Sequence, residues 1–134
     1  MKRATSIGLV FATVVFGGFA EAAPDAIAPS PVASLDSDND QTIDISEMGK
    51  AASDTFDKLD SDGDGNVDRT ALGKRMSKNE FKTADADKDN VLNKNEYFLY
   101  ADSLLRAADP DKDGTLDEKE FSTKEGKKLL GLIQ

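Results

Sequence analysis

The chain has 134 residues, with 17 Lys and Arg against 26 Asp and Glu, and it contains no Cys, His or Trp. These absences exclude disulfide scaffolds, thiolate or imidazole metal sites, and catalysis by a Cys or His side chain, so we do not expect an enzyme. A formal net charge of −9 disfavours nucleic acids and anionic membranes as partners and favours cations or basic proteins.

The N-terminal segment, residues 1–22, is typical of a secretory signal peptide. Two basic residues precede the apolar residues 7–19, and Ala20-Glu21-Ala22 is a cleavage site of small residues. The apolar stretch is shorter than the ~20 residues that a membrane-spanning helix needs. We therefore expect cleavage after Ala22, export to the periplasm and no membrane attachment afterwards. Residues 23–34 are rich in Ala, Pro and Ser, which predicts a disordered, extended leader without a helix, ahead of a metal-binding domain at residues 35–134.

A twelve-residue acidic segment then recurs four times, beginning at residues 36, 60, 85 and 109, so the period is 24 or 25 residues. Each segment is a loop of EF-hand type, which surrounds a hard cation with oxygen ligands from positions 1, 3, 5, 7, 9 and 12. The predicted metal ligands are Asp36, Asp38, Asp40, Thr42, Asp44 and Glu47 in loop one; Asp60, Asp62, Asp64, Asn66 and Asp68 in loop two; Asp85, Asp87, Asp89, Val91, Asn93 and Glu96 in loop three; and Asp109, Asp111, Asp113, Thr115, Asp117 and Glu120 in loop four.

The loops differ at position 6, where the chain turns, and at position 12, where Glu closes the site. Loop four has Gly114 at the turn and follows the pattern throughout. Gln41 and Asn90 occupy the turn in loops one and three, where a positive φ favours Gly, and we expect strain in loop one in particular. Ala71 replaces the closing Glu in loop two, which we expect to be the weakest site.

An acidic run is often only a solvated surface, but these four loops also share an apolar residue at position 8. Those residues are Ile43, Val67, Leu92 and Leu116. A solvated surface has no reason to repeat an apolar position, whereas paired EF-hand loops contact each other there through a short two-stranded segment. The repeat therefore favours metal binding by paired loops.

The short period leaves 12 or 13 residues between loops, which is room for one helix. Each helix must therefore leave one loop and enter the next, and the predicted fold is all-α with helices shared between successive loops. The predicted helices are Ile45–Leu59, Arg69–Ala84, Lys94–Ala108 and Glu118–Ile133. The second is expected to break near Ser77, where Ser77 and Glu80 have the spacing of a capping box.

This layout resembles the lanmodulin family of periplasmic lanthanide-binding proteins. The resemblance rests on the signal peptide, the close loop spacing and the loop-four stretch from Asp109 to Asp117, with Pro110 at position 2 and Asp at position 9. It implies a compact three-helix bundle with peripheral loops, in which loops one and four pair and loops two and three pair. It also implies ordering on lanthanide binding, and a periplasmic lanthanide-dependent dehydrogenase or an uptake component as partner. The other three loops depart from the family by lacking Pro at position 2.

The carboxylate count favours a trivalent ion. Positions 1, 3, 5, 9 and 12 carry five carboxylates in loops one and four and four in loops two and three. More negative charge favours the ion of higher valence, because the attraction scales with the product of the charges. We therefore expect selective capture of lanthanide ions such as La³⁺, Ce³⁺ or Nd³⁺, two to four per chain, coupled to folding. The alternative is a periplasmic Ca²⁺ buffer or sensor, which Gln41 and Ala71 favour.

Overall fold

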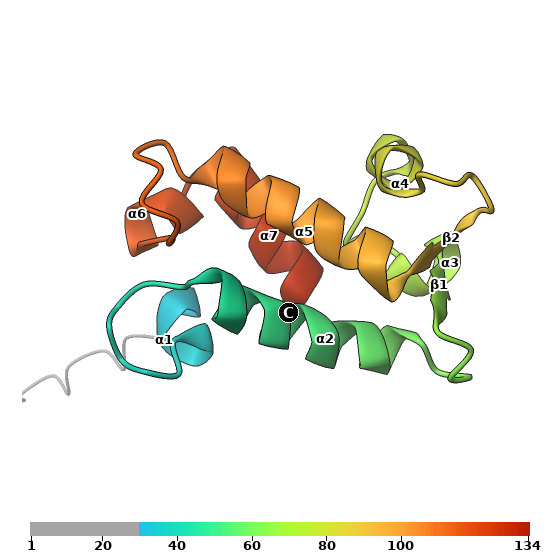
Figure 1. Ribbon diagram of the computed structural model, residues 1–134, viewed down its shortest axis with the longest axis horizontal. Coiled ribbons are helices and arrows are strands. Elements are labelled where there is room, and N and C mark those ends of the chain that lie inside the picture. The colour runs from blue at the N-terminus through green and yellow to red at the C-terminus, as the bar shows by residue number, and fades with distance from the viewer. Residues whose placement is uncertain (1–29) are drawn as a thin grey trace, which may run out of the picture.

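The computed structural model describes residues 30–134 (Figure 1). The predicted signal peptide and residues 23–29 of the predicted leader lie outside this part of the chain. The end of the leader differs from the extended, disordered conformation that we expected, because Pro31–Leu35 forms a short helix, α1. Pro31 starts this helix at a position where no amide donor is needed. Val32 is buried in the core, and α1 contacts α2 and α6, so packing orders this segment.

Three long helices form a bundle, in agreement with the predicted fold class: α2 (Ile45–Leu59), α5 (Lys94–Ala108) and α7 (Lys124–Ile133). Each of them packs against the other two. The apolar stripe of α2 faces inward, where Phe56 meets Tyr97 of α5 edge to face with ring centroids 5.4 Å apart. Within residues 30–134, no helix combines the length and apolarity needed to cross a membrane.

The predicted helix Arg69–Ala84 is divided, as expected. It consists of α3 (Arg69–Leu72) and α4 (Lys78–Ala84). Gly73 ends α3 with a φ of 54°, which is the left-handed region that glycine adopts without steric cost. The capping box between Ser77 and Glu80 starts α4.

The predicted continuous helix Glu118–Ile133 was wrong. It is divided into α6 (Glu118–Phe121) and α7, and Thr123 caps the start of α7 by accepting a hydrogen bond from the Gly126 amide at 3.0 Å. A Cβ at Gly126 would lie 2.3 Å from the carbonyl oxygen of Glu120 and 2.6 Å from the Cα of Phe121. This close approach folds α7 back over the end of α6, and only glycine permits it.

The four loops lie in pairs at the two ends of the bundle (Figure 1). Strand β1 (Asn66–Asp68) of loop two pairs antiparallel with β2 (Val91–Asn93) of loop three. In loops one and four, Ile43 and Leu116 form an isolated antiparallel bridge with both hydrogen bonds at 3.0 Å. The position-8 residues of all four loops are fully buried. The pairing implied by the family resemblance is therefore confirmed.

Candidate metal centres

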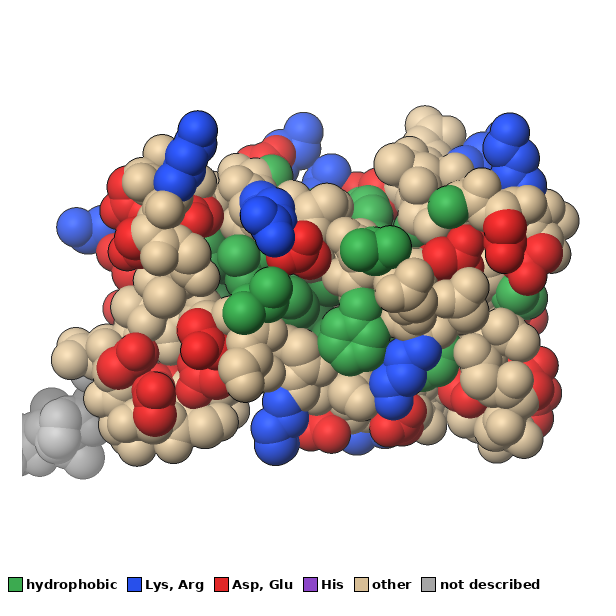
Figure 2. Space-filling model, viewed as in Figure 1, with side chains coloured by type: hydrophobic (Ala, Val, Ile, Leu, Met, Phe, Trp, Pro, Cys, Tyr) green, Lys and Arg blue, Asp and Glu red, His purple; other side chains and the backbone are tan. Residues whose placement is uncertain are grey.

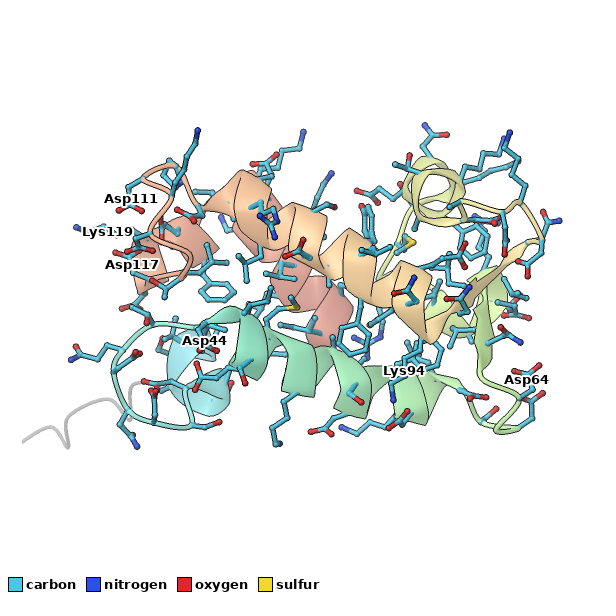
Figure 3. All side chains as sticks on the ribbon, viewed as in Figure 1. Asp44, Asp64, Lys94, Asp111, Asp117 and Lys119 are labelled. Carbon is cyan, nitrogen blue, oxygen red and sulfur yellow. The ribbon has the colours of Figure 1, made fainter. Side chains whose placement is uncertain are left out.

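Each loop brings three carboxylates together. The groups are Asp36, Asp38 and Asp40; Asp60, Asp62 and Asp64; Asp85, Asp87 and Glu96; and Asp109, Asp111 and Glu120, and within each group one oxygen of every residue lies within 4.8 Å of the others. Two oxygens bound to one ion at ~2.4 Å can be no more than ~4.8 Å apart, so the spacing suits a single hard cation. Acidic side chains gather at both ends of the molecule (Figure 2), with Asp44, Asp111 and Asp117 at one end and Asp64 at the other (Figure 3).

The aspartate at position 1 organises the backbone of its loop. In loop two, Asp60 Oδ1 accepts a hydrogen bond from the Gly63 amide at 2.8 Å, and Oδ2 accepts one from the Gly65 amide at 2.9 Å. These bonds hold two left-handed turns, at positions 4 and 6. The residues with positive φ are Asn39, Gly63, Lys88 and Lys112 at position 4, and Gln41, Gly65, Asn90 and Gly114 at position 6. The turn at position 4 was not predicted, because two of its four residues are lysines, which do not mark a left-handed conformation.

A buried carboxylate oxygen in loop three lacks a hydrogen-bond partner. Asp85 is 6% exposed, and its Oδ1 has no partner within residues 30–134, whereas Oδ2 accepts a bond from the Asn90 amide at 3.2 Å. Leaving a buried charged oxygen unpaired is unfavourable. A cation held between Asp85, Asp87 and Glu96 would satisfy this oxygen, which fits a metal centre better than a solvated acidic surface.

The glutamate at position 12 differs in its contacts between loops. In loop three, Glu96 Oε2 accepts a bond from the Asn93 amide at 3.1 Å, and Oε1 accepts one from the Ala86 amide at 2.9 Å. In loop one, Glu47 Oε1 likewise accepts a bond from the position-2 amide. Pro110 occupies position 2 in loop four and has no amide hydrogen. The Oε1 atom of Glu120 is therefore free of the contact that its counterparts in loops one and three make.

Repulsion among the loop-four carboxylates affects the titration of Glu120. Desolvation raises the pKa of Glu120, and the negative charges of Asp111, Asp117 and Asp109 raise it further, against one hydrogen bond from the Asp117 amide. A cation in this loop would remove the repulsion and favour the ionised carboxylate.

The predicted ligands outside these groups have other roles in the structure. The position-9 side chains of Asp44, Asp68, Asn93 and Asp117 cap the helices that follow them. Position 9 commonly reaches the ion through a water molecule, which such a cap permits. The position-5 carboxylates Asp89 and Asp113 lie outside the groups of loops three and four. In every loop, the position-5 carboxylate accepts a hydrogen bond from the backbone amide of the residue at position 7. The position-7 residues are Thr42, Asn66, Val91 and Thr115.

Loop two lacks only its closing carboxylate. Ala71 lines a hollow of about 230 Å³ together with Ser61, Asp62, Asp64 and other loop-two residues. Its amide donates to Asp68 Oδ1 at 2.8 Å, so the backbone cap of α3 is kept. The backbone is therefore arranged as in the other loops, and the missing side chain is the local difference.

Two stretches of the chain match known protein families. Residues 99–123, which include all of loop four, match an EF-hand domain pair, and residues 53–70, which end just before Ala71, match an EF hand. No curated protein matches the chain. The two family matches and the four carboxylate groups together support an EF-hand protein that binds metal ions.

Proposed function

We propose that this EF-hand protein selectively captures lanthanide ions in the periplasm and that binding drives its helical bundle into the compact form. The observation that carries the proposal is the pairing of loops one and four. These are the two loops with five carboxylates each, and the Ile43–Leu116 bridge holds them side by side at one end of the bundle.

The charge of this pair favours trivalent ions. Five carboxylates around one ion leave a local charge of −3 with Ca²⁺ and −2 with La³⁺, and two such centres lie next to each other. One further unit of ionic charge gains ~1 kcal/mol for each carboxylate at ~4 Å, even in a water-like dielectric. This gain, repeated over several carboxylates, opposes the higher cost of dehydrating the trivalent ion.

Folding on binding follows from the same charges. Without an ion, the carboxylates of a loop repel one another. In loop four, desolvation raises the pKa of Glu120, and the charges of Asp111, Asp117 and Asp109 raise it further. The core that opposes this repulsion belongs to a small domain with a strongly negative chain. Since the ion neutralises the loops, the free energy of binding contributes directly to the free energy of folding.

The second candidate function is a Ca²⁺ buffer or sensor. Loops two and three carry four carboxylates each, and Gln41 keeps a φ of 71° in loop one without the freedom of glycine. Both features would weaken binding and reduce the advantage of a trivalent ion. EF-hand proteins generally act as binding or sensor proteins, which agrees with either candidate.

A titration of the metal-free chain followed by far-UV circular dichroism separates the two candidates. La³⁺ and Ca²⁺ are added in parallel, each buffered by a chelator to a known free concentration. Helix formation at sub-nanomolar La³⁺, with millimolar Ca²⁺ needed for the same change, would support lanthanide capture. Equal folding with micromolar Ca²⁺ would favour the calcium candidate, and a spectrum unchanged by saturating metal would contradict folding on binding.

The periplasmic location and the partners implied by the family resemblance are tested separately. Cell fractionation should recover the chain in the periplasmic fraction with Ala23 as its first residue. Recovery in the cytoplasm with Met1 intact would contradict both the signal peptide and a role beside a periplasmic dehydrogenase or uptake component.

A further inference from the structure

A basic hollow lies between the α3–α4 segment and the outer face of α7. It has a volume of about 800 Å³ and is open to solvent. Six of the chain's 17 Lys and Arg residues line it, against one acidic residue, Glu80. The basic residues are Arg69, Lys74, Arg75, Lys78, Lys127 and Lys128. Such a concentration of positive charge is unexpected in a chain with a net charge of −9.

Two of these six residues have partners within the fold. Lys128 forms an ion pair with Glu80 at 2.7 Å, and Arg75 donates to the carbonyl oxygens of Gly131 and Gln134 at 3.1 Å each. The remaining four take part in no ion pair within residues 30–134, and all four side chains are exposed. The hollow therefore presents more positive charge than the intramolecular contacts of this part of the chain neutralise.

The shape and composition of the hollow favour an extended ligand over a small one. Small-molecule sites enclose most of their ligand, whereas this hollow is open. Three of its four free charges are lysines, which are mobile point charges, and Arg75 has its planar donor group turned to the backbone oxygens of Gly131 and Gln134. A single phosphate is held best by an arginine fork. With Arg75 engaged in this way, Arg69 is the one other arginine of the lining, without an ion pair within residues 30–134, beside the three separate charges of Lys74, Lys78 and Lys127. Several separate carboxylates along a peptide match spaced lysines.

We propose that the basic hollow between the α3–α4 segment and α7 is a docking surface for an acidic, Asp- and Glu-rich segment of a partner protein. Gly131 lies among the basic residues, and apart from its chain neighbours and its own helix backbone, no heavy atom of the described chain comes within 4 Å of the position of its missing Cβ, which leaves space for a peptide backbone. Arg69 belongs to loop two, but none of the grouped loop carboxylates lines the hollow. The proposal does not depend on which ion the loops bind.

The test is a fluorescence-anisotropy titration of a labelled poly-glutamate decapeptide with the purified chain at saturating Ca²⁺. The hollow variant Lys74→Glu/Lys127→Glu reverses one free charge on each side of the hollow. The control Lys50→Glu/Lys58→Glu changes the net charge equally but lies on α2. We expect the hollow variant to weaken binding by roughly tenfold or more and the control by less than roughly threefold, because only nearby charges escape screening.

Raising NaCl from about 20 mM to about 200 mM should also weaken binding by the unaltered chain. The variant Lys74→Ala/Lys127→Ala, which removes charge without reversing it, should weaken peptide binding to an intermediate extent. It keeps the test valid if the charge-reversed variant misfolds. Equal weakening by the hollow and control variants would overturn the proposal, since it would show attraction to the chain as a whole. Absence of peptide binding would also overturn the proposal. This holds even if inorganic phosphate or phosphatidylglycerol vesicles, tested in parallel, bind at the hollow.

Discussion

Replacing Ala71 by Glu should convert loop two from the weakest metal centre into a complete one. Ala71 borders the hollow that also contains Asp62 and Asp64, and about 230 Å³ of space is present there. Loop two already has the positive φ values at Gly63 and Gly65 that the other loops show at the same positions. The new side chain therefore needs no rearrangement of the backbone to reach an ion held by the three aspartates.

The expected gain follows from the added charge. A unit charge ~4 Å from an ion contributes ~1 kcal/mol for each unit of ionic charge in a water-like dielectric, hence ~2 kcal/mol for Ca²⁺ and ~3 kcal/mol for La³⁺. Since about 1.4 kcal/mol changes an equilibrium constant tenfold, loop two should bind Ca²⁺ roughly 30-fold and La³⁺ roughly 150-fold more tightly.

The assay is a chelator-buffered titration that counts the tight equivalents of La³⁺ and Ca²⁺ per chain. Ala71→Gln is the matched control, because Gln can complete a capping box with the Asp68 amide but adds no charge. Ala71→Glu should add one tight equivalent, and Ala71→Gln should add none. Equal effects of the two substitutions would show that helix capping, and not the missing carboxylate, limits loop two, and no effect of either would refute the reasoning.

Three further predictions concern the other loops and α4. Pro110→Ala introduces an amide that can donate to Glu120 Oε1 and compete with the ion, so the affinity of loop four should fall by up to roughly tenfold in the same titration; unchanged affinity would contradict this role of proline. Gln41→Gly relieves a φ of 71°, at a gain of ~1 kcal/mol, and loop one should bind roughly fivefold more tightly; weaker binding would show that no strain is stored there. Glu80 accepts a hydrogen bond from Lys128, which with further hydrogen bonds lowers its pKa from 4.5 to about 2. A lowered folded-state pKa stabilises the fold above pH 4.5 and loses this effect as the pH falls towards 2. The difference in unfolding free energy between the unaltered chain and Glu80→Gln, measured by urea titration, should therefore shrink from pH ~5 to pH ~3; a constant difference would contradict the ion pair.

Most of the fold was predictable because the metal-loop pattern delimits the helices. The helices Ile45–Leu59 and Lys94–Ala108 have the predicted ends, since a loop stands at both ends of each. The apolar residue at position 8 indicated that the loops pair, and the pairing partners followed from the family resemblance. These features depend on local spacing and side-chain chemistry, which a sequence displays directly.

The two errors in the predicted fold have different physical causes. The break between α6 and α7 occurs at Ser122 and Thr123, with no Gly or Pro at the break itself, and it depends on how closely Gly126 approaches Glu120. The helix α1 forms in a Pro-rich segment because Val32 finds a place in the core. The contact of Val32 with the core has no signature in local composition. Thr123, in contrast, is a residue type that commonly begins helices, and it could have indicated the break.

The sequence predicted which acidic residues lie in the candidate sites, but it did not predict which three carboxylates of each loop come together. The loop pattern identified the acidic residues that the structure brings together, while the third member of each group differs: it is at position 5 in loops one and two and at position 12 in loops three and four. In loop two, Ala71 leaves no carboxylate at position 12. The bond from the position-7 amide to the position-5 carboxylate is the same in all four loops and does not account for the difference. Direct ligation by each predicted residue stays a prediction, which the metal titrations above address.

The helices α2 and α5 contain 15 residues each, and each connects a loop at one end of the bundle to a loop at the other. At 1.5 Å per residue, both span ~22 Å. Together with the two loop pairings they form a closed frame whose opposite sides are of equal length. The two helices would thus set the distance between ions bound at opposite ends of the bundle, while ions bound within one pair of loops would be close neighbours. Luminescence energy transfer between two different bound lanthanides would report these two distances separately. The spread of the longer distance would measure how rigid the bundle is.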